Sequence, residues 1–177
     1  MNIFISILIL IFLIIVALFL MTSLTGAPYV PTLKPGLKEA FKKLYPLGKK
    51  DLIIDLGAGD GTVLSEATKC GAKAIGVEIN PILALIMKHR FRNDSRVKIK
   101  CKNLYHFTFP KETTVIYTFA VSLHIEPIYR KIQSEANRLK KPIYFISNAF
   151  DIPNLKPKAK VNTFYLYKIT PKASDEH

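Results

Sequence analysis

The 177-residue sequence predicts an α/β protein in which a mostly parallel sheet of about six to seven strands has helices on both faces. From Asp51 onward, short β-branched and apolar runs alternate with segments of helical periodicity, which is typical of such a sheet. A glycine-rich turn follows the first run, and an uncharged apolar segment precedes the whole pattern. We therefore expect four parts: a transmembrane anchor at 1–25, a connector and amphipathic helix at 26–50, a globular domain at 51–170 and a disordered tail at 171–177.

From residue 3 to residue 21 the N-terminal segment is rich in apolar residues and contains no charged residue, glycine or proline. About 20 such residues in a helix cross a hydrocarbon core of about 30 Å, so the segment is long enough to span a membrane. A cleaved signal peptide is the alternative, and residues 23–27 would tolerate cleavage. The apolar run is long for a signal peptide, however, and only Met1 and Asn2 precede it. We expect a single-pass transmembrane helix.

Basic residues flank this segment on its C-terminal side only, namely Lys34, Lys38, Lys42, Lys43, Lys49 and Lys50. The positive-inside rule then puts the domain on the cytoplasmic side of the membrane. The chain has 26 Lys and Arg against 13 Asp and Glu, and this net charge of +13 suits anionic lipid, nucleic acid or an acidic protein. Lipid contacts of the flanking lysines account for much of the charge, so we expect a membrane and not nucleic acid as the partner.

Metal and disulfide chemistry have little support in the composition. Cys70 and Cys101 are too few and too far apart for a zinc site or a disulfide framework. The four histidines show no paired ligand spacing. We expect two free thiols in a reducing compartment and no metal site.

A connector and a short helix precede the domain. Residues 28–32, Pro-Tyr-Val-Pro-Thr, predict a stiff extended connector, because each proline fixes its own φ and biases the preceding residue away from helix. Pro35 suits the first turn of a helix whose apolar stripe is Leu37, Phe41 and Leu44.

Six strands and three helices are expected in the domain. The strands are rich in apolar residues, as buried parallel strands require, and cover 52–56, 74–79, 97–101, 115–119, 143–147 and 164–169. The helices cover 62–70, 81–91 and 127–139. Gly71 suits the end of the first helix, and Pro81 and Pro127 suit the starts of the other two.

The strongest local signal is the turn Asp-Leu-Gly-Ala-Gly-Asp-Gly at 55–61, between the first strand and a helix. Glycines there adopt positive φ and let a ligand approach the backbone, and the helix N-terminus offers free N–H groups. A dinucleotide fingerprint has its third glycine one residue later, where this chain has Thr62. Asp55 lies two residues before the first glycine, where a carboxylate suits a cation better than a diphosphate. The turn favours a ligand with ammonium and sulfonium groups, and an NAD-dependent oxidoreductase is the alternative.

A second signal is Glu78, which ends the second strand in Gly-Val-Glu-Ile-Asn-Pro at 76–81. A carboxylate at this place can accept hydrogen bonds from both ribose hydroxyls of a nucleoside ligand. The alternative is a solvated charge at the end of a strand. The glycine turn upstream favours the nucleoside interpretation.

Together, residues 55–61 and 76–81 resemble motif I and the acidic loop after the second strand of class I S-adenosylmethionine-dependent methyltransferases, which have a Rossmann-like fold. The apolar segment, the connector and both motifs are similar to small membrane-anchored protein-lysine methyltransferases, which include the mitochondrial enzymes that modify the ADP/ATP carrier and the ATP synthase c subunit. The resemblance implies S-adenosylmethionine as cofactor and a lysine of a membrane or membrane-associated protein as methyl acceptor. A non-catalytic, cofactor-binding assembly factor at the membrane is a further alternative.

The resemblance also implies that Asp55, Gly57, Gly59 and Glu78 bind the cofactor and that the connector helps to close the active site. With their neighbours, the predicted cofactor-binding set is Asp55, Gly57, Ala58, Gly59, Asp60, Gly61, Glu78, Asn80 and Asn103. Two positions depart from the family pattern. Thr62 stands where relatives usually carry arginine, and Asn103 replaces an acidic residue after the third strand, where it can still bond the adenine amino group.

Methyl transfer to lysine needs alignment and a deprotonated amine, helped by a carboxylate or a channel of low polarity. The candidate catalytic residues are the carboxylates Asp60 and Glu126 and the channel-wall residues Tyr29 and Thr32, with Tyr117 and His124 as further wall residues. Each has a structural alternative, such as turn bonds for Asp60 and a helix start for Glu126. The fourth strand lacks the Asn/Asp-Pro-Pro-Tyr/Phe motif of enzymes that methylate nucleobase amines.

Overall fold

The computed structural model describes residues 3–25, 34–119 and 122–172, with side chains described for 3–16, 35–119 and 125–172. The chain forms two compact units, Met1–Val30 and Pro31–His177. The first contains α1 (Ile3–Thr25), whose large apolar side chains are exposed from Ile3 to Ile15. A helix over the predicted apolar segment is therefore confirmed. No helix within the described residues combines the length and hydropathy needed to cross a membrane.

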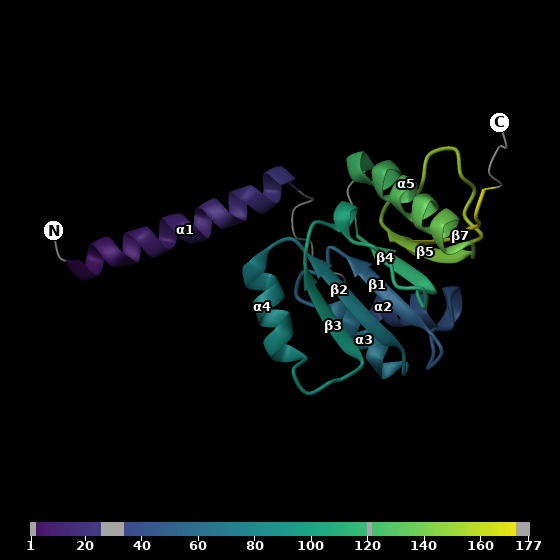
Figure 1. The fold of residues 1–177 in the computed structure, drawn as a ribbon, viewed down its shortest axis with the longest axis horizontal. Coiled ribbons are helices and arrows are strands. Elements are labelled where there is room, and N and C mark those ends of the chain that lie inside the picture. Colours follow the sequence, from purple (N-terminus) through teal and green to yellow (C-terminus); the bar gives the residue numbers. More distant parts are fainter. Residues whose placement is uncertain (1–2, 26–33, 120–121, 173–177) are drawn as a thin grey trace. The chain divides into compact units, whose positions relative to one another are not determined.

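The second unit is built on a seven-stranded sheet in the order β3-β2-β1-β4-β5-β7-β6 (Figure 1). The strands are β1 (Leu52–Leu56), β2 (Lys73–Glu78), β3 (Val97–Cys101), β4 (Val115–Thr118), β5 (Ile143–Asn148), β6 (Ala159–Val161) and β7 (Phe164–Ile169). The first five pair in parallel, and β7 is antiparallel to both β5 and β6. The mostly parallel sheet and all six predicted strands are confirmed. The sequence pattern misses β6 because this strand has only three residues and none of them is buried.

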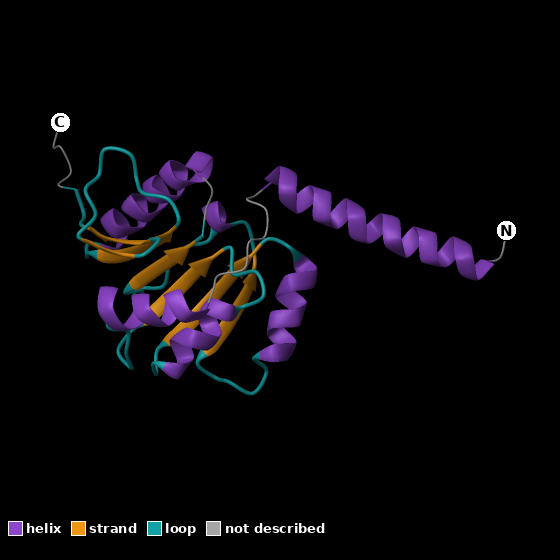
Figure 2. Ribbon diagram, turned by 180° about the vertical axis from the view of Figure 1, so that it is seen from behind, coloured by secondary structure: helices purple, strands orange, loops and turns teal. Residues whose placement is uncertain are grey.

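Helices cover both faces of the sheet, as predicted (Figure 2). One face packs against α2 (Lys34–Glu39), the π-helical turn η1 (Ala40–Leu44), α3 (Thr62–Lys69) and α4 (Pro81–Arg90), and the other against α5 (Ser122–Leu139). The sheet therefore has two hydrophobic cores: the first core lies on the face covered by α2, η1, α3 and α4, and the second core lies on the face covered by α5. Side chains along a strand point alternately to opposite faces, so Ile53 packs into the first core and its neighbour Ile54 into the second.

The apolar stripe predicted ahead of the domain is confirmed, because Leu37, Phe41 and Leu44 are all buried in the first core. The helix that carries them changes from α to π geometry at Ala40 and ends before Tyr45. Gly71 follows the end of α3 with a φ of +89°, which fits its predicted place after that helix. Residues 28–32 of the predicted connector and 173–177 of the predicted tail lie outside the described residues.

The predicted start of the last helix is wrong, because α5 begins at Ser122 and Pro127 lies inside it. A proline there removes one backbone hydrogen bond, since it has no N–H group. The added turn carries Ile125, which is only 1% exposed and packs with Ile128 and Ile132 in the second core. Burying an isoleucine side chain contributes roughly 1.5–3 kcal/mol, enough to offset the missing bond.

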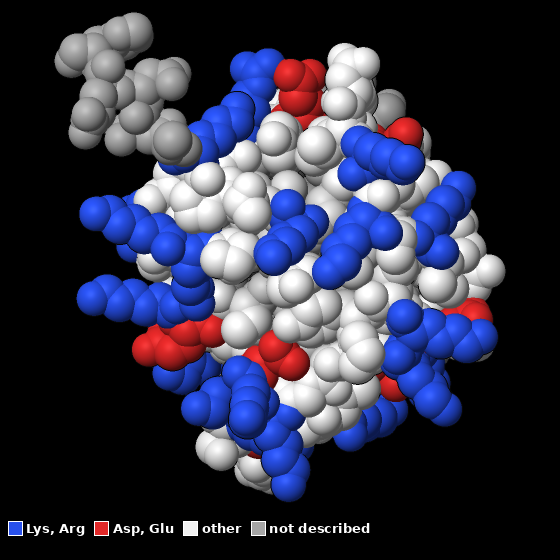
Figure 3. Space-filling model, turned by 90° about the vertical axis from the view of Figure 1, so that its right-hand side faces the viewer, with Lys and Arg blue, Asp and Glu red and all other residues white. Residues whose placement is uncertain are grey.

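Basic side chains prevail over acidic ones on the surface of the protein, as the net charge of +13 requires. Lys and Arg are spread over much of the face shown in Figure 3, with a few Asp and Glu between them. Such a surface attracts anionic partners and repels cationic ones over a distance set by the salt concentration.

Candidate functional site

The glycine turn leaves the end of β1 and lies against the end of β2. Gly57, Gly59 and Gly61 have φ values of +87°, +54° and +77°, which other residues adopt only with strain. The N–H groups of Gly57 and Ala58 both donate to the carbonyl oxygen of Val77, at 2.9 and 3.0 Å. A side chain at Gly57 would meet no atom within 4 Å, so the backbone borders open space at this point. The structure confirms the positive-φ turn that the sequence predicts.

The last glycine of the turn has a different role. A Cβ atom on Gly61 would come within 2.7 Å of the Phe91 ring and 3.2 Å of Met87. Gly61 therefore lets the end of α4 pack closely against the turn. Arg90 strengthens this contact, because its Nη1 donates to the backbone oxygen of Asp60 at 2.7 Å. The sequence carries no local signal for this bond, since its partners are 30 residues apart.

Glu78 connects the two predicted motifs. Its Oε2 accepts a hydrogen bond from the N–H of Gly59 at 2.8 Å, and its Oε1 accepts one from the N–H of Asn80 at 2.9 Å. The side chain is buried, so it is not the solvated strand-end charge of the alternative interpretation. Each carboxylate oxygen has a further lone pair, so Glu78 can hold both loops and still accept hydrogen bonds from ribose hydroxyls.

Asp55 is a buried carboxylate without a cationic partner among the described residues. It is 2% exposed in β1, between Gly76 of β2 and Tyr117 of β4. Burial raises the pKa of its carboxyl group well above the usual range, and the carboxylates of Glu78 and Asp60 raise this pKa further. No hydrogen bond from another described residue reaches the side chain, whose oxygens keep slight access to solvent. An ammonium group is the kind of ligand that would relieve this arrangement, because it supplies both charge and donors.

The carboxylate of Asp60 is engaged in the turn itself. Its Oδ1 accepts from the N–H of Thr62 at 3.0 Å and its Oδ2 from the Thr62 hydroxyl at 2.8 Å. Thr62, which departs from the family pattern, thus fixes the side chain of Asp60 at the start of α3. These contacts match the structural alternative for Asp60, and its role as a base stays a prediction.

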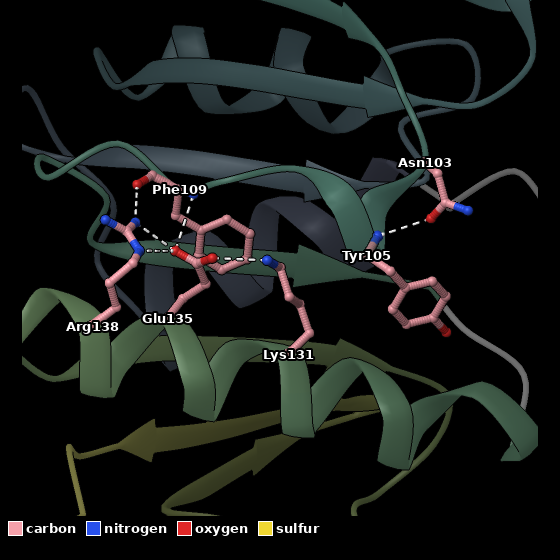
Figure 4. Close-up of polar contacts among 6 residues, drawn as sticks. All are labelled: Asn103, Tyr105, Phe109, Lys131, Glu135 and Arg138. Carbon is pink, nitrogen blue, oxygen red and sulfur yellow. Dashed lines mark hydrogen bonds and ion pairs between the residues drawn. The ribbon is translucent and has the colours of Figure 1, made fainter.

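Asn80 and Asn103 each cap the element that follows them. The Asn80 side-chain oxygen accepts from the N–H groups of Ile82 and Leu83, at 2.9 and 3.3 Å, at the start of α4. The Asn103 oxygen accepts from the N–H of Tyr105 at 2.9 Å (Figure 4). Since β2 and β3 are parallel to β1, both caps lie at the same edge of the sheet as the glycine turn.

The remaining candidate catalytic residues differ in burial, and some of them lie outside the described residues. Glu126 lies on α5 with its side chain 52% exposed and ion-paired to Arg130 at 2.5 Å. Tyr117 is 1% exposed and packs near Phe164 in the first core. Tyr29, Thr32 and the side chain of His124 lie outside the described residues. The roles of all these residues in catalysis stay predictions.

One contributor to this edge of the sheet, Thr118, is not predicted by the sequence pattern. The buried hydroxyl of Thr118, at the end of β4, donates to the carbonyl oxygen of Leu56 at 2.9 Å and so ties β4 to the start of the turn. A threonine within a β-rich run gives no hint of such a bond. Among the described side chains, no group of three or more His, Cys, Asp and Glu is placed to hold a metal ion.

Strand order 3-2-1-4-5-7-6 with one antiparallel strand, a glycine turn after β1 and an acidic residue at the end of β2 define a Rossmann-like methyltransferase of class I. A solved structure of an RNA methyltransferase from Salinibacter ruber with S-adenosyl-L-homocysteine has the same fold, with a TM-score of 0.69. It covers 83% of this chain and 98% of its own, at 22% sequence identity. A family model narrows the class: the ANTKMT methyltransferase domain matches residues 55–159, and the chain belongs to that family.

Two curated relatives illustrate the family. The chain is 27% identical over 133 residues to a lysine N-methyltransferase of the ATP synthase c subunit from Xenopus laevis, covering 73% of this chain and 56% of the relative. It is 29% identical over 164 residues to a protein-lysine N-methyltransferase of Saccharolobus islandicus, covering 84% of this chain and 98% of that protein. The chain thus spans little more than half of the first relative and nearly all of the second. Membership of a methyltransferase family favours S-adenosylmethionine over NAD as the cofactor.

Proposed function

We propose that the protein transfers a methyl group from S-adenosylmethionine to the side-chain nitrogen of a lysine in another protein. Membership of the ANTKMT methyltransferase family and the protein-lysine substrates named for two relatives support this reaction. The structural observation that carries the proposal is Asp55, a buried carboxylate beside the glycine turn that lacks a donor among the described residues. The amino group of the methionine part of the cofactor would supply one.

The residues of the site fit the parts of this cofactor. Asp55 would hold the ammonium group, and Glu78 would accept hydrogen bonds from the ribose hydroxyls. The open space at Gly57 would let the ligand lie against the backbone. Asn103, at the end of β3, would lie near the adenine. When bound, S-adenosylmethionine supplies a methyl group already activated by its sulfonium, so the protein's main task is alignment.

The acceptor lysine must lose a proton before it attacks the methyl group. Asp60 lies within the glycine turn, but Thr62 already donates two hydrogen bonds to its carboxylate. Glu126 is exposed and paired with Arg130. We therefore propose that desolvation of the lysine, which lowers its pKa, does more than any one base. Tyr29 and Thr32 of the connector are the proposed walls of such a channel.

The substrate class and location follow the same reasoning. We propose that α1 anchors the protein in a membrane, with the domain on the cytoplasmic side, and that the substrate is a membrane or membrane-associated protein. Support comes from the uncharged sequence of α1, the lysines that follow it and the ATP synthase component named for the Xenopus relative. The anchor would bring the site to substrates held at the same surface.

Incubation of native membranes with purified protein and radiolabelled methyl donor tests the reaction. We expect label in a protein band, on lysine after hydrolysis, and at least tenfold less label with Glu78→Ala, because that change frees both loops and removes the ribose contact. Glu112→Ala is the matched control, since Glu112 is exposed and lies outside the site. Donor binding without any labelling would favour the assembly-factor alternative, and label in RNA would favour the nucleic-acid partner that the basic surface allows.

A further inference from the structure

The outer face of α4 is apolar where a surface helix is ordinarily polar. Ile82, Leu85 and Ile86 have exposed fractions of 41%, 68% and 51%. With 3.6 residues per turn, these three side chains share one side of the helix, and Ala84 and Met87, which are 1% and 0% exposed, lie on the opposite side. The three residues, called the α4 ridge below, therefore point away from the core. An exposed apolar group of this kind marks a binding surface.

Cationic side chains frame the α4 ridge. Exposed Lys88 and Arg90 follow it on the two flanks of the helix, and exposed Arg92 comes two residues after the helix ends. Residues 81–102 contain a single carboxylate, Asp94. It is already ion-paired with Arg96 at 2.7 Å. The surroundings of the ridge thus carry a net positive charge.

We propose that the α4 ridge docks into the interface of an anionic lipid membrane. A membrane surface has acyl chains beneath negatively charged headgroups, and an amphipathic helix matches both layers when its apolar side chains enter about 5–10 Å and its cations meet the headgroups. A second copy of this chain would bring two cationic surfaces together, which like-charge repulsion opposes. The exposed apolar residues and the surrounding charge therefore favour lipid as the occupant.

The membrane contact of the α4 ridge would assist the proposed methyl transfer, and this role rests on the proposed function. Asn80 caps α4 directly after Glu78, and Arg90 near the other end of the helix binds the backbone of Asp60. Both ends of α4 are thus tied to the cofactor site. A ridge seated in the membrane would hold this site at the bilayer surface, where the side chains of membrane proteins emerge.

The chain contains no tryptophan, so a single introduced indole reports its own surroundings. Leu85→Trp places it on the α4 ridge, and Ser134→Trp places it at an exposed position of α5, on the other face of the sheet. Each full-length variant is reconstituted with vesicles of brominated phosphatidylcholine and phosphatidylglycerol. We expect several-fold stronger quenching for Leu85→Trp than for Ser134→Trp. Replacing the phosphatidylglycerol with phosphatidylcholine, or adding salt, should remove most of the difference.

Equal quenching of the two indoles would overturn the proposal, and so would quenching of Leu85→Trp that does not depend on anionic lipid. A blue shift that depends on protein concentration without vesicles would identify a second copy as the occupant instead. Adding Lys88→Glu to Leu85→Trp should lower the quenching, whereas Lys140→Glu on the loop after α5 should not. Calorimetric binding of S-adenosylhomocysteine by the same variants is a separate readout, so its absence would count against the proposed function and not against the membrane contact.

Discussion

At the scale of single residues, we expect Asp55 to strengthen cofactor binding and to lower the stability of the ligand-free protein. Asp55→Asn keeps the shape of the side chain and removes a buried charge that lacks a partner among the described residues. We expect the variant to bind S-adenosylhomocysteine about 10- to 100-fold more weakly, because a hydrogen bond to a charged group is worth ~1.5–3 kcal/mol. Without ligand, we expect its free energy of unfolding at pH 7 to rise by about 1–3 kcal/mol. Calorimetry and urea unfolding measure the two effects.

The gain in stability should depend on pH with a definite sign. Because the pKa of Asp55 is raised above 3.8 in the folded protein, the unfolded chain ionises first as pH rises, and folding loses stability between 3.8 and the folded pKa. The difference between Asp55→Asn and wild type should therefore be absent below pH 3.8 and grow as pH increases. Asp151→Asn, at an exposed aspartate, is the control and should change neither quantity. A stabilised variant that binds ligand normally would contradict the assignment of Asp55.

At the scale of elements, Glu135 fastens α5 to the segment before β4 (Figure 4). Its carboxylate, buried on α5, accepts from Lys131 at 2.7 Å, from Nε of Arg138 at 2.9 Å and from the N–H of Phe109 at 3.2 Å. Burial acts to raise the pKa of Glu135, but the hydrogen bonds of Lys131 and Arg138 outweigh it and hold this pKa below 4.5. The stability that Glu135 contributes is therefore present above pH 4.5 and lost as pH falls through its folded pKa.

Glu135→Gln should lower the free energy of unfolding by about 2 kcal/mol near pH 7, since it weakens several hydrogen bonds to charged groups. The matched control is Glu126→Gln on the same helix, whose ion pair with Arg130 is exposed. That change should cost less than about 1 kcal/mol, as exposed pairs do. Urea unfolding of both variants measures the difference, and equal losses would show that the Glu135 contacts do not fasten α5. Methyl transfer by Glu126→Gln also tests the predicted catalytic role of Glu126.

At the scale of the whole molecule, the proposed anchor has a direct test. Leu10→Arg with Leu13→Arg puts two charges near the middle of the apolar segment, where each costs ~2.5–3.5 kcal/mol on insertion. We expect wild type to stay in the membrane pellet after alkaline extraction, and this variant to be released. Leu10→Ala with Leu13→Ala is the control and should stay in the pellet. Release of wild type under the same conditions would contradict the anchor.

The proposed orientation is tested on the two thiols that the domain exposes. Cys70 and Cys101 are both free and exposed. A membrane-impermeant maleimide should label them only after cells are permeabilised, if the domain faces the cytoplasm. Labelling of intact cells would reverse the orientation.

Local sequence patterns were enough for much of the fold. Six strands, the glycine turn and the apolar stripe of Leu37, Phe41 and Leu44 were predicted because each depends on residues that are close along the chain. The start of α5 was not, because Pro127 is a strong local signal that burial of Ile125 outweighs. The three-residue β6 was missed because its only support is pairing with β7.

The sequence by itself determined the class of the site: the positions of Asp55, Glu78 and the glycines select a nucleoside-type cofactor with a cationic group. Only the tertiary structure showed that Glu78 holds both loops, that Asp55 has no donor among the described residues and that the α4 ridge faces outward. The physical reason is the range of the interactions. Backbone φ angles and apolar periodicity follow from neighbours in sequence, whereas burial, charge pairing and exposure follow from what the fold brings beside each residue.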